Sequence, residues 1–118
     1  MNHTTPVPFL TGGGGGIGSV TARELARAGY AVVVSDIDLD AAKATVAGVH
    51  EDGGVAEAVR LDATSRADVI AAVDGVVDRF GRLDLAVNNA GLQHFAAIDD
   101  ITEDHLYSLV NLNLAGYV

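Results

Sequence analysis

An unbroken run of five glycines is the stretch of this sequence best suited to chemistry. A short apolar segment precedes it, and with its flanking residues the run reads Thr11-Gly12-Gly13-Gly14-Gly15-Gly16-Ile17-Gly18. Glycine permits a tight backbone turn and leaves no Cβ to keep a pyrophosphate away from the backbone. A helix that starts within such a turn offers unpaired N–H groups and its positive dipole end to an anion. The run therefore predicts a phosphate-binding turn.

The spacing of the glycines fits two fingerprints. The first, G-x-G-x-x-G, is formed by Gly13, Gly15 and Gly18. The second, T-G-x-x-x-G-x-G, is formed by Thr11, Gly12, Gly16 and Gly18. A flexible linker is the third interpretation. Against a linker, residues at helical spacing follow the run, namely Ile17, Val20, Thr21, Leu25 and Ala28, and Gly29 can end that helix.

An acidic residue ends the next apolar segment. Residues 31–36 form a continuous apolar run that stops at Asp36, 18 residues after Gly18. Its carboxylate can accept hydrogen bonds from the hydroxyls of an adenosine ribose, and it would repel a 2′-phosphate, so NAD is favoured over NADP. The alternative is a solvated strand-end acid or a local helix cap, since Asp38 and Asp40 are close by.

Polar residues also follow the later apolar segments. Asp62 can contact the edge of an adenine and Ala63 can pack on it, although a loop aspartate that caps the next helix is nearly as good an interpretation. The segment Asn88-Asn89-Ala90-Gly91 can bond backbone across neighbouring strands and let a cofactor approach, or it is a plain turn. Asn113 lies on an apolar helical stripe, either as a satisfied core amide or at a bend that frees a carbonyl to hold a water.

Alternating strands and helices must position these residues. We expect strands over 7–11, 31–36, 55–61 and 83–87, with Pro8 delaying the start of the first. The expected helices cover 16–28, a stretch from the N-cap Asp38 to Gly53-Gly54, a stretch from a capping box at Ser65 to Gly81, and a last one from about Thr102. The buried stripe of the third helix is predicted to consist of Val69, Val73, Val77 and Phe80. Such alternation predicts a doubly wound α/β fold with a parallel sheet, truncated after the fourth β-α unit.

Composition narrows the class of protein. The 118 residues are 49% hydrophobic and carry a formal net charge of −9, which disfavours nucleic acid and anionic membranes as partners. There is no cysteine, and the histidines lack metal-ligand spacing, so we expect no disulfide and no metal. We recognise no signal peptide and no apolar run of membrane length, and we expect a cytoplasmic protein with a single domain over 1–118.

Taken together, these motifs resemble the N-terminal part of a short-chain dehydrogenase/reductase. The glycine turn, Asp36, Asp62, the Asn-Asn-Ala-Gly segment and Leu112-Asn113-Leu114-x-Gly116 occur in that family's order and spacing. The resemblance implies a Rossmann-like domain and favours the second glycine fingerprint. It implies cofactor contacts at Gly12, Gly16, Ile17, Gly18, Asp36, Ile37, Asp62, Ala63, Asn89, Ala90 and Gly91. Asn113 would be the catalytic-tetrad residue that positions a water in the proton relay.

The chain departs from the family pattern in its catalytic residues. The family's Ser and Tyr-x-x-x-Lys pair are absent, and Lys43 is the only lysine. One interpretation is the N-terminal part of an enzyme, homo-oligomeric at full length, that transfers hydride between NAD(P) and a small alcohol or carbonyl substrate. The alternative is a catalytically silent nucleotide-binding module or a subunit completed by a partner. The stretch from Asn89 to His94, which includes Gln93, is also similar to the one found in 3-hydroxybutyrate dehydrogenases of this family. Relatives with other substrates carry similar residues, so the identity of the substrate stays undecided.

Overall fold

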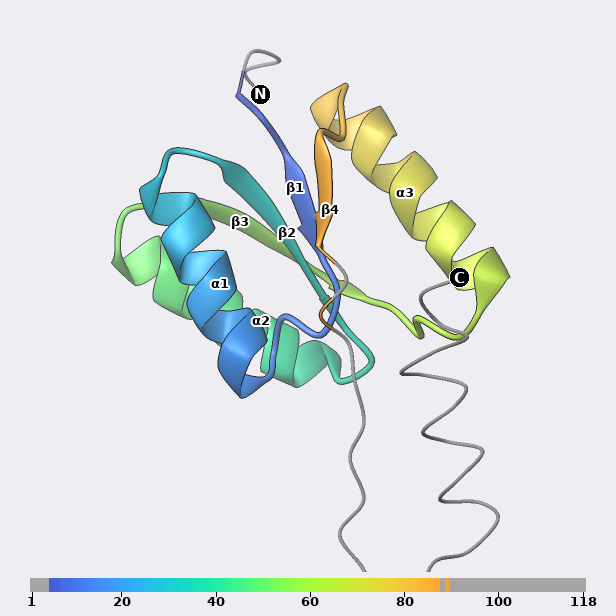
Figure 1. Cartoon of the computed structure of the whole chain (residues 1–118), viewed down its shortest axis with the longest axis horizontal. Helices are drawn as coiled ribbons and strands as arrows, with labels where there is room; N and C mark the ends of the chain where they lie inside the picture. Colours follow the sequence, from blue (N-terminus) through green and yellow to red (C-terminus); the bar gives the residue numbers. More distant parts are fainter. Residues whose placement is uncertain (1–4, 88, 90–118) are drawn as a thin grey trace, which may run out of the picture.

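The computed structural model describes residues 5–87 and 89, which form a parallel sheet covered by helices (Figure 1). The strand order is β3-β2-β1-β4. Along the chain the elements are β1 (Pro8–Leu10), α1 (Gly16–Arg27), β2 (Ala31–Asp36), α2 (Leu39–Glu51), β3 (Val55–Arg60), α3 (Arg66–Phe80) and β4 (Leu85–Val87). This alternation and the parallel pairing confirm the predicted doubly wound α/β class. The helix expected from Thr102 lies outside the described residues.

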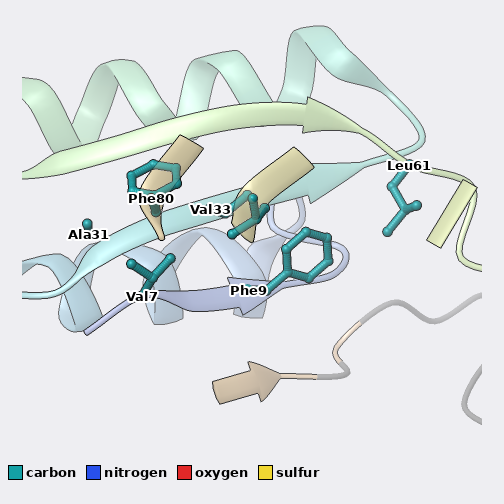
Figure 2. Packing of buried hydrophobic residues seen from close by; sticks show 7 residues of the cluster. Val7, Phe9, Ala31, Val33, Leu61 and Phe80 are labelled. Carbon is teal, nitrogen blue, oxygen red and sulfur yellow. The ribbon is translucent and has the colours of Figure 1, made fainter. Parts of the chain in front are cut away.

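The strand β2 lies inside the sheet and buries side chains on both of its faces. Its residues alternate between two hydrophobic clusters, because successive side chains of a strand point to opposite faces. One cluster lies on the side of α3 and contains Val7, Phe9, Ala31, Val33, Leu61, Val76 and Phe80 (Figure 2). The other lies on the side of α1 and α2 and contains Leu10, Ala22, Ala26, Val32, Val34, Ala42 and Val49. The continuous apolar run of β2 is thus explained by burial on two sides.

Pro8 belongs to β1, contrary to the expectation that the strand begins after it. Pro8 is the first residue of β1 and is aligned with Leu85 of β4. A proline is tolerated at the first position of a strand, where the missing N–H costs the ladder little. The prediction treated the position as interior to the strand, where proline is rare.

Polar caps and glycines delimit the helices much as predicted. The Asp38 side chain accepts a hydrogen bond from the Ala41 N–H at the start of α2, and Ser65 does the same for Asp68 N–H at the start of α3. Only half of the expected capping box forms, because the Ser65 N–H donates to the Asp62 carbonyl. The chain leaves α1, α2 and α3 through glycines with positive φ, namely Gly29, Gly53 and Gly81.

The residues at helical spacing in α1 and the predicted stripe of α3 match the buried faces of these helices only in part. Ile17 and Val20 are 77% and 62% exposed, and Ala28 is exposed as well. The face of α1 that is buried instead consists of Gly18, Ala22 and Ala26. In α3, Phe80 is buried and Val69 packs against the core as predicted, but Val77 is 44% exposed and its neighbour Val76 is fully buried in its place. Small residues let α1 approach the sheet closely, which outweighs the burial of larger side chains elsewhere on the helix.

None of the helices within residues 5–87 is long and apolar enough to cross a membrane.

Candidate functional site

The glycine turn leads from the end of β1 into α1, at the edge of the sheet where the parallel strands end (Figure 1). Gly12 has a φ of 64°, a conformation that favours glycine. A Cβ on Gly18 would collide with the Gly12 carbonyl oxygen and lie 2.8 Å from Asn89 Nδ2. The turn and the first turn of α1 are therefore in direct backbone contact, which glycine at both positions makes possible.

The remaining glycines of the run divide into two kinds. A Cβ on Gly13 would lie 2.5 Å from Val34 Cγ1, and one on Gly14 would lie 2.5 Å from Ala41 Cβ. These two positions need glycine because side chains of β2 and α2 pack directly against them. A Cβ on Gly15 would meet only the Gly12 oxygen at 3.6 Å, and one on Gly16 would meet no described atom within 4 Å. Packing among the described residues does not require glycine at these two positions, which border space that those residues leave open.

The N-terminus of α1 borders the same open space. Its N-cap residue is Gly15, which has no side chain to accept hydrogen bonds from the first N–H groups of the helix. Those groups have no acceptor within the helix, because the carbonyls four residues earlier are not helical. An uncapped helix start beside open space suits an anion.

Hydrogen bonds from three other segments hold the glycine turn. The Gly13 N–H donates to the Ser35 carbonyl at 2.9 Å, and the Gly14 N–H donates to Asp36 Oδ2 at 3.0 Å. Thr45 Oγ1 donates to the Gly13 carbonyl at 2.8 Å. Asn89 Nδ2 donates to the Gly12 carbonyl at 3.1 Å. Hydrogen bonds within the protein thus define the conformation of the turn.

Asp36 lies at the end of β2 with both carboxylate oxygens engaged. Oδ2 accepts from Gly14 N–H, and Oδ1 accepts from Asp38 N–H at 3.0 Å. Asp36 therefore makes a local backbone contact, but the residue that caps α2 is Asp38 and not Asp36. A carboxylate oxygen can accept more than one hydrogen bond, so both oxygens keep acceptor capacity. Ile37, the next residue, is 60% exposed.

Asp62 reaches the same edge of the sheet, because the Leu61 N–H donates to the Asp36 carbonyl at 3.0 Å. The Oδ1 atom of Asp62 accepts hydrogen bonds from Thr64 N–H at 3.0 Å and from Thr64 Oγ1 at 2.6 Å. These two hydrogen bonds lower the pKa of Asp62 below 3.8, against a smaller opposing effect of desolvation. A tight local turn ahead of α3 is therefore formed, and Ala63, within it, is partly buried.

Asn89 joins the end of β4 to the glycine turn. Its N–H donates to Thr11 Oγ1 at 3.0 Å, in addition to the side-chain bond to Gly12. The expectation that an amide here bonds backbone of a neighbouring strand end agrees with this geometry. Its expected partners in the site, Ala90, Gly91 and Asn113, lie outside the described residues, as do Gln93 and His94.

Thr45 is a residue of the site that sequence reasoning did not single out. It is 6% exposed and lies on the buried face of α2 with Ala42 and Val49. A hydroxyl within an otherwise apolar helical stripe was a usable signal, because buried polar groups need a hydrogen-bond partner. Its partner, Gly13, is 32 residues away in sequence and could be found only from the fold.

The sequence and the fold are both similar to those of known dehydrogenases. The family model described as short chain dehydrogenase matches residues 7–118. An uncharacterised oxidoreductase of Bacillus subtilis, YxjF, is 40% identical over 110 residues, which are 93% of this chain and 43% of the relative. Galactitol 2-dehydrogenase of Agrobacterium fabrum is 36% identical over 116 residues, 98% of this chain and 44% of the relative.

A solved structure titled as NAD+-bound xylitol dehydrogenase has the same arrangement of elements. It matches with a TM-score of 0.87 at 38% identity, and the match covers 94% of this chain and 43% of that one. This chain therefore spans less than half of the length of these relatives.

Proposed function

This chain belongs to the short-chain dehydrogenase family, and on that premise we propose that it is the NAD-binding part of an oxidoreductase acting on small alcohols or carbonyl compounds. The chain's own contribution would be to bind and orient the dinucleotide. The nicotinamide of that cofactor supplies the hydride chemistry when bound.

One observation supports a dinucleotide above all: the open space at Gly16 borders an uncapped helix N-terminus. Packing explains Gly13, Gly14 and Gly18, but within residues 5–87 and 89 it gives no reason for glycine at Gly16. A pyrophosphate that approaches the backbone closely would give that reason. We assign the pyrophosphate to the turn from Gly12 to Gly18, with Ile17 flanking it.

The adenosine end is assigned to the residues after β2 and β3. Asp36 would accept hydrogen bonds from the ribose hydroxyls, with Ile37 beside it, and Asp62 and Ala63 would flank the adenine. The segment after β2 carries carboxylates at Asp36, Asp38 and Asp40 and no basic residue. A 2′-phosphate would meet this negative charge, which is the basis for preferring NAD to NADP.

The far end of the cofactor is assigned by family membership. Asn89, Ala90 and Gly91 would line the inner ribose and nicotinamide, and Asn113 would position a water for proton transfer. In the family a tyrosine activated by a lysine moves the substrate proton, but no tyrosine among these 118 residues has a lysine four positions later. We therefore propose that hydride transfer belongs to a longer protein, homo-oligomeric as is usual in the family, and that these residues alone bind NAD without turnover. The similarity to galactitol 2-dehydrogenase and xylitol dehydrogenase favours a substrate with a secondary alcohol.

A nucleotide-binding module without catalysis, or a subunit completed by a partner, is the second candidate. Turnover with the longer protein would distinguish the two, because a silent module binds NAD but oxidises no alcohol at any protein length.

Calorimetric titration of the protein with NAD+ and NADP+ tests cofactor binding and preference. We expect tighter binding of NAD+, and we expect Asp36→Asn to reduce the NAD+ to NADP+ affinity ratio roughly tenfold, equivalent to about 1.4 kcal/mol. Asp74→Asn is the matched control, since it removes the same charge from an exposed position in α3, away from the segment that begins at Asp36. Absence of binding by the parent, or tighter binding of NADP+, would contradict the proposal.

A further inference from the structure

We propose that Thr45 is a positioning residue that sets the recognition of the cofactor ribose, acting through Gly13, Gly14 and Asp36. This inference rests on the proposed function and adds a residue that would not itself contact the ligand. Thr45 belongs to the middle of α2 and is 6% exposed. Its hydroxyl is therefore shielded from water and depends on protein acceptors.

The single proton of the Thr45 hydroxyl is directed to the glycine turn. Oγ1 lies 2.8 Å from the Gly13 carbonyl oxygen and 3.4 Å from the carbonyl oxygen of Ala41, one helical turn earlier. Threonines in helices commonly bond the carbonyl four residues earlier, as Thr21 does with Ile17 at 2.8 Å. At Thr45 the shorter distance is the one to the Gly13 carbonyl, which is far away in sequence. This hydroxyl therefore joins α2 to the glycine turn.

That hydrogen bond orients one peptide plane. The carbonyl of Gly13 and the N–H of Gly14 belong to the same planar peptide and point in opposite directions. Thr45 holds the carbonyl end, and Asp36 Oδ2 accepts from the N–H end at 3.0 Å. Glycines on both sides of this peptide restrict its rotation little, because they lack side chains. Besides the packing of β2 and α2 against these glycines, the two hydrogen bonds therefore hold the plane in place.

The orientation of the Asp36 carboxylate depends on this arrangement. Its Oδ2 is bound by Gly14 N–H and its Oδ1 by Asp38 N–H, so two backbone donors define the direction of the remaining acceptor sites. If the Thr45 hydroxyl is removed, the Gly13–Gly14 peptide can rotate and Oδ2 loses its donor. Two ribose hydroxyls need two correctly directed acceptors, so recognition of the diol would weaken more than recognition of the pyrophosphate.

The test compares Thr45→Val, which removes the hydroxyl and keeps the shape, with Thr45→Ser, which keeps the hydroxyl and removes a buried methyl group. Thr21→Val is the matched control, because it removes a hydroxyl that bonds its own helix. Calorimetry gives the NAD+ and NADP+ affinities, thermal unfolding gives Tm, and NMR hydrogen exchange reports the Gly14 amide.

We expect Thr45→Val to weaken NAD+ binding roughly tenfold, as for loss of one well-placed hydrogen bond, with a smaller change for NADP+ and faster exchange at Gly14. Thr45→Ser should bind NAD+ like the parent even though its Tm falls, and Thr21→Val should leave affinity and exchange unchanged. Equal losses of NAD+ affinity in Thr45→Ser and Thr45→Val, or a parent-like NAD+ affinity of Thr45→Val, would overturn this inference and leave the proposed function intact. A parent that binds neither dinucleotide would overturn the proposed function and this role together.

Discussion

Replacing Gly16 by alanine should separate the stability of the fold from the binding of the cofactor. Gly16 is the first residue of α1, and a Cβ added there would meet no described atom within 4 Å. The methyl group therefore costs the folded protein nothing in packing. It would, however, occupy the space through which we propose that the pyrophosphate approaches the backbone.

The expected gain in stability comes from the unfolded chain. Alanine has fewer conformations to lose than glycine, so Gly→Ala at a compatible position stabilises by about 0.5–1 kcal/mol. In a domain of this size, 1 kcal/mol raises Tm by roughly 4–8 °C. Affinity for NAD+ should fall at the same time, by at least roughly tenfold if the methyl displaces a phosphate from one N–H group, because hydrogen bonds to charged groups contribute about 1.5–3 kcal/mol.

Thermal unfolding monitored by circular dichroism and calorimetric titration with NAD+ measure the two effects. Gly48→Ala is the matched control: Gly48 lies within α2, and its Cβ would meet the Arg23 guanidinium at an ordinary 3.6 Å. It should raise Tm similarly and leave NAD+ affinity unchanged. Gly18→Ala is the opposite case, because its Cβ would collide with the Gly12 carbonyl and lower Tm.

Two outcomes would refute the reasoning about Gly16. A Tm below that of the parent would show that packing does require glycine there. An NAD+ affinity equal to that of the parent would show that the open space at Gly16 is not the approach of the pyrophosphate.

Two further predictions concern stability. Ser65→Ala removes the acceptor for the Asp68 N–H at the start of α3, so thermal unfolding should show a loss of about 1 kcal/mol; a parent-like Tm would mean that water replaces the cap. Asp84→Asn tests a pH effect: hydrogen bonds from Arg82 and the Val7 N–H hold the pKa of Asp84 below its ordinary 3.8, so its stabilisation is present above about pH 4 and is lost as pH falls through the lowered pKa. Urea unfolding should therefore show a parent-to-variant difference at pH 7 that shrinks below pH 4, and a pH-independent difference would contradict the assignment.

The order of the elements and the class of fold followed from local patterns. The apolar run that ends at Asp36 and the cap signals at Asp38 and Ser65 predict elements that the structure contains. Such signals act over a few residues, and the fold does not override them here. Family resemblance, rather than spacing alone, selected the fingerprint with Gly12 and Gly16 over the one with Gly13 and Gly15.

The helix faces were predicted less well, for a physical reason. Ile17 and Val20 suggest the buried face of α1 by their size, but the helix packs through Gly18, Ala22 and Ala26. Close approach of the helix backbone to the glycine turn decides its rotation. Small residues four apart were the signal for this, and hydrophobic periodicity weights them too little.

The identities of the partners in the contacts that shape the site were beyond sequence reasoning. The hydrogen bonds of Thr45 with Gly13 and of Asn89 with Gly12 join residues 32 and 77 positions apart. No local pattern specifies such partners, because they arise only when α2 and the end of β4 converge on the turn.

The three consecutive valines of β2 bear on how the sheet avoids misalignment during folding. Val32 and Val34 face one cluster and Val33 faces the other, and all three are fully buried. A slip of β2 by two residues keeps every side chain on its own face, so Val32 and Val34 alone oppose it weakly. It would, however, carry the Asp36 carboxylate into the place of Val34, where an uncompensated charge is strongly unfavourable. Asp36 therefore disfavours this two-residue shift in strand pairing as well as serving the proposed ribose site. An apolar residue in its place would remove that penalty.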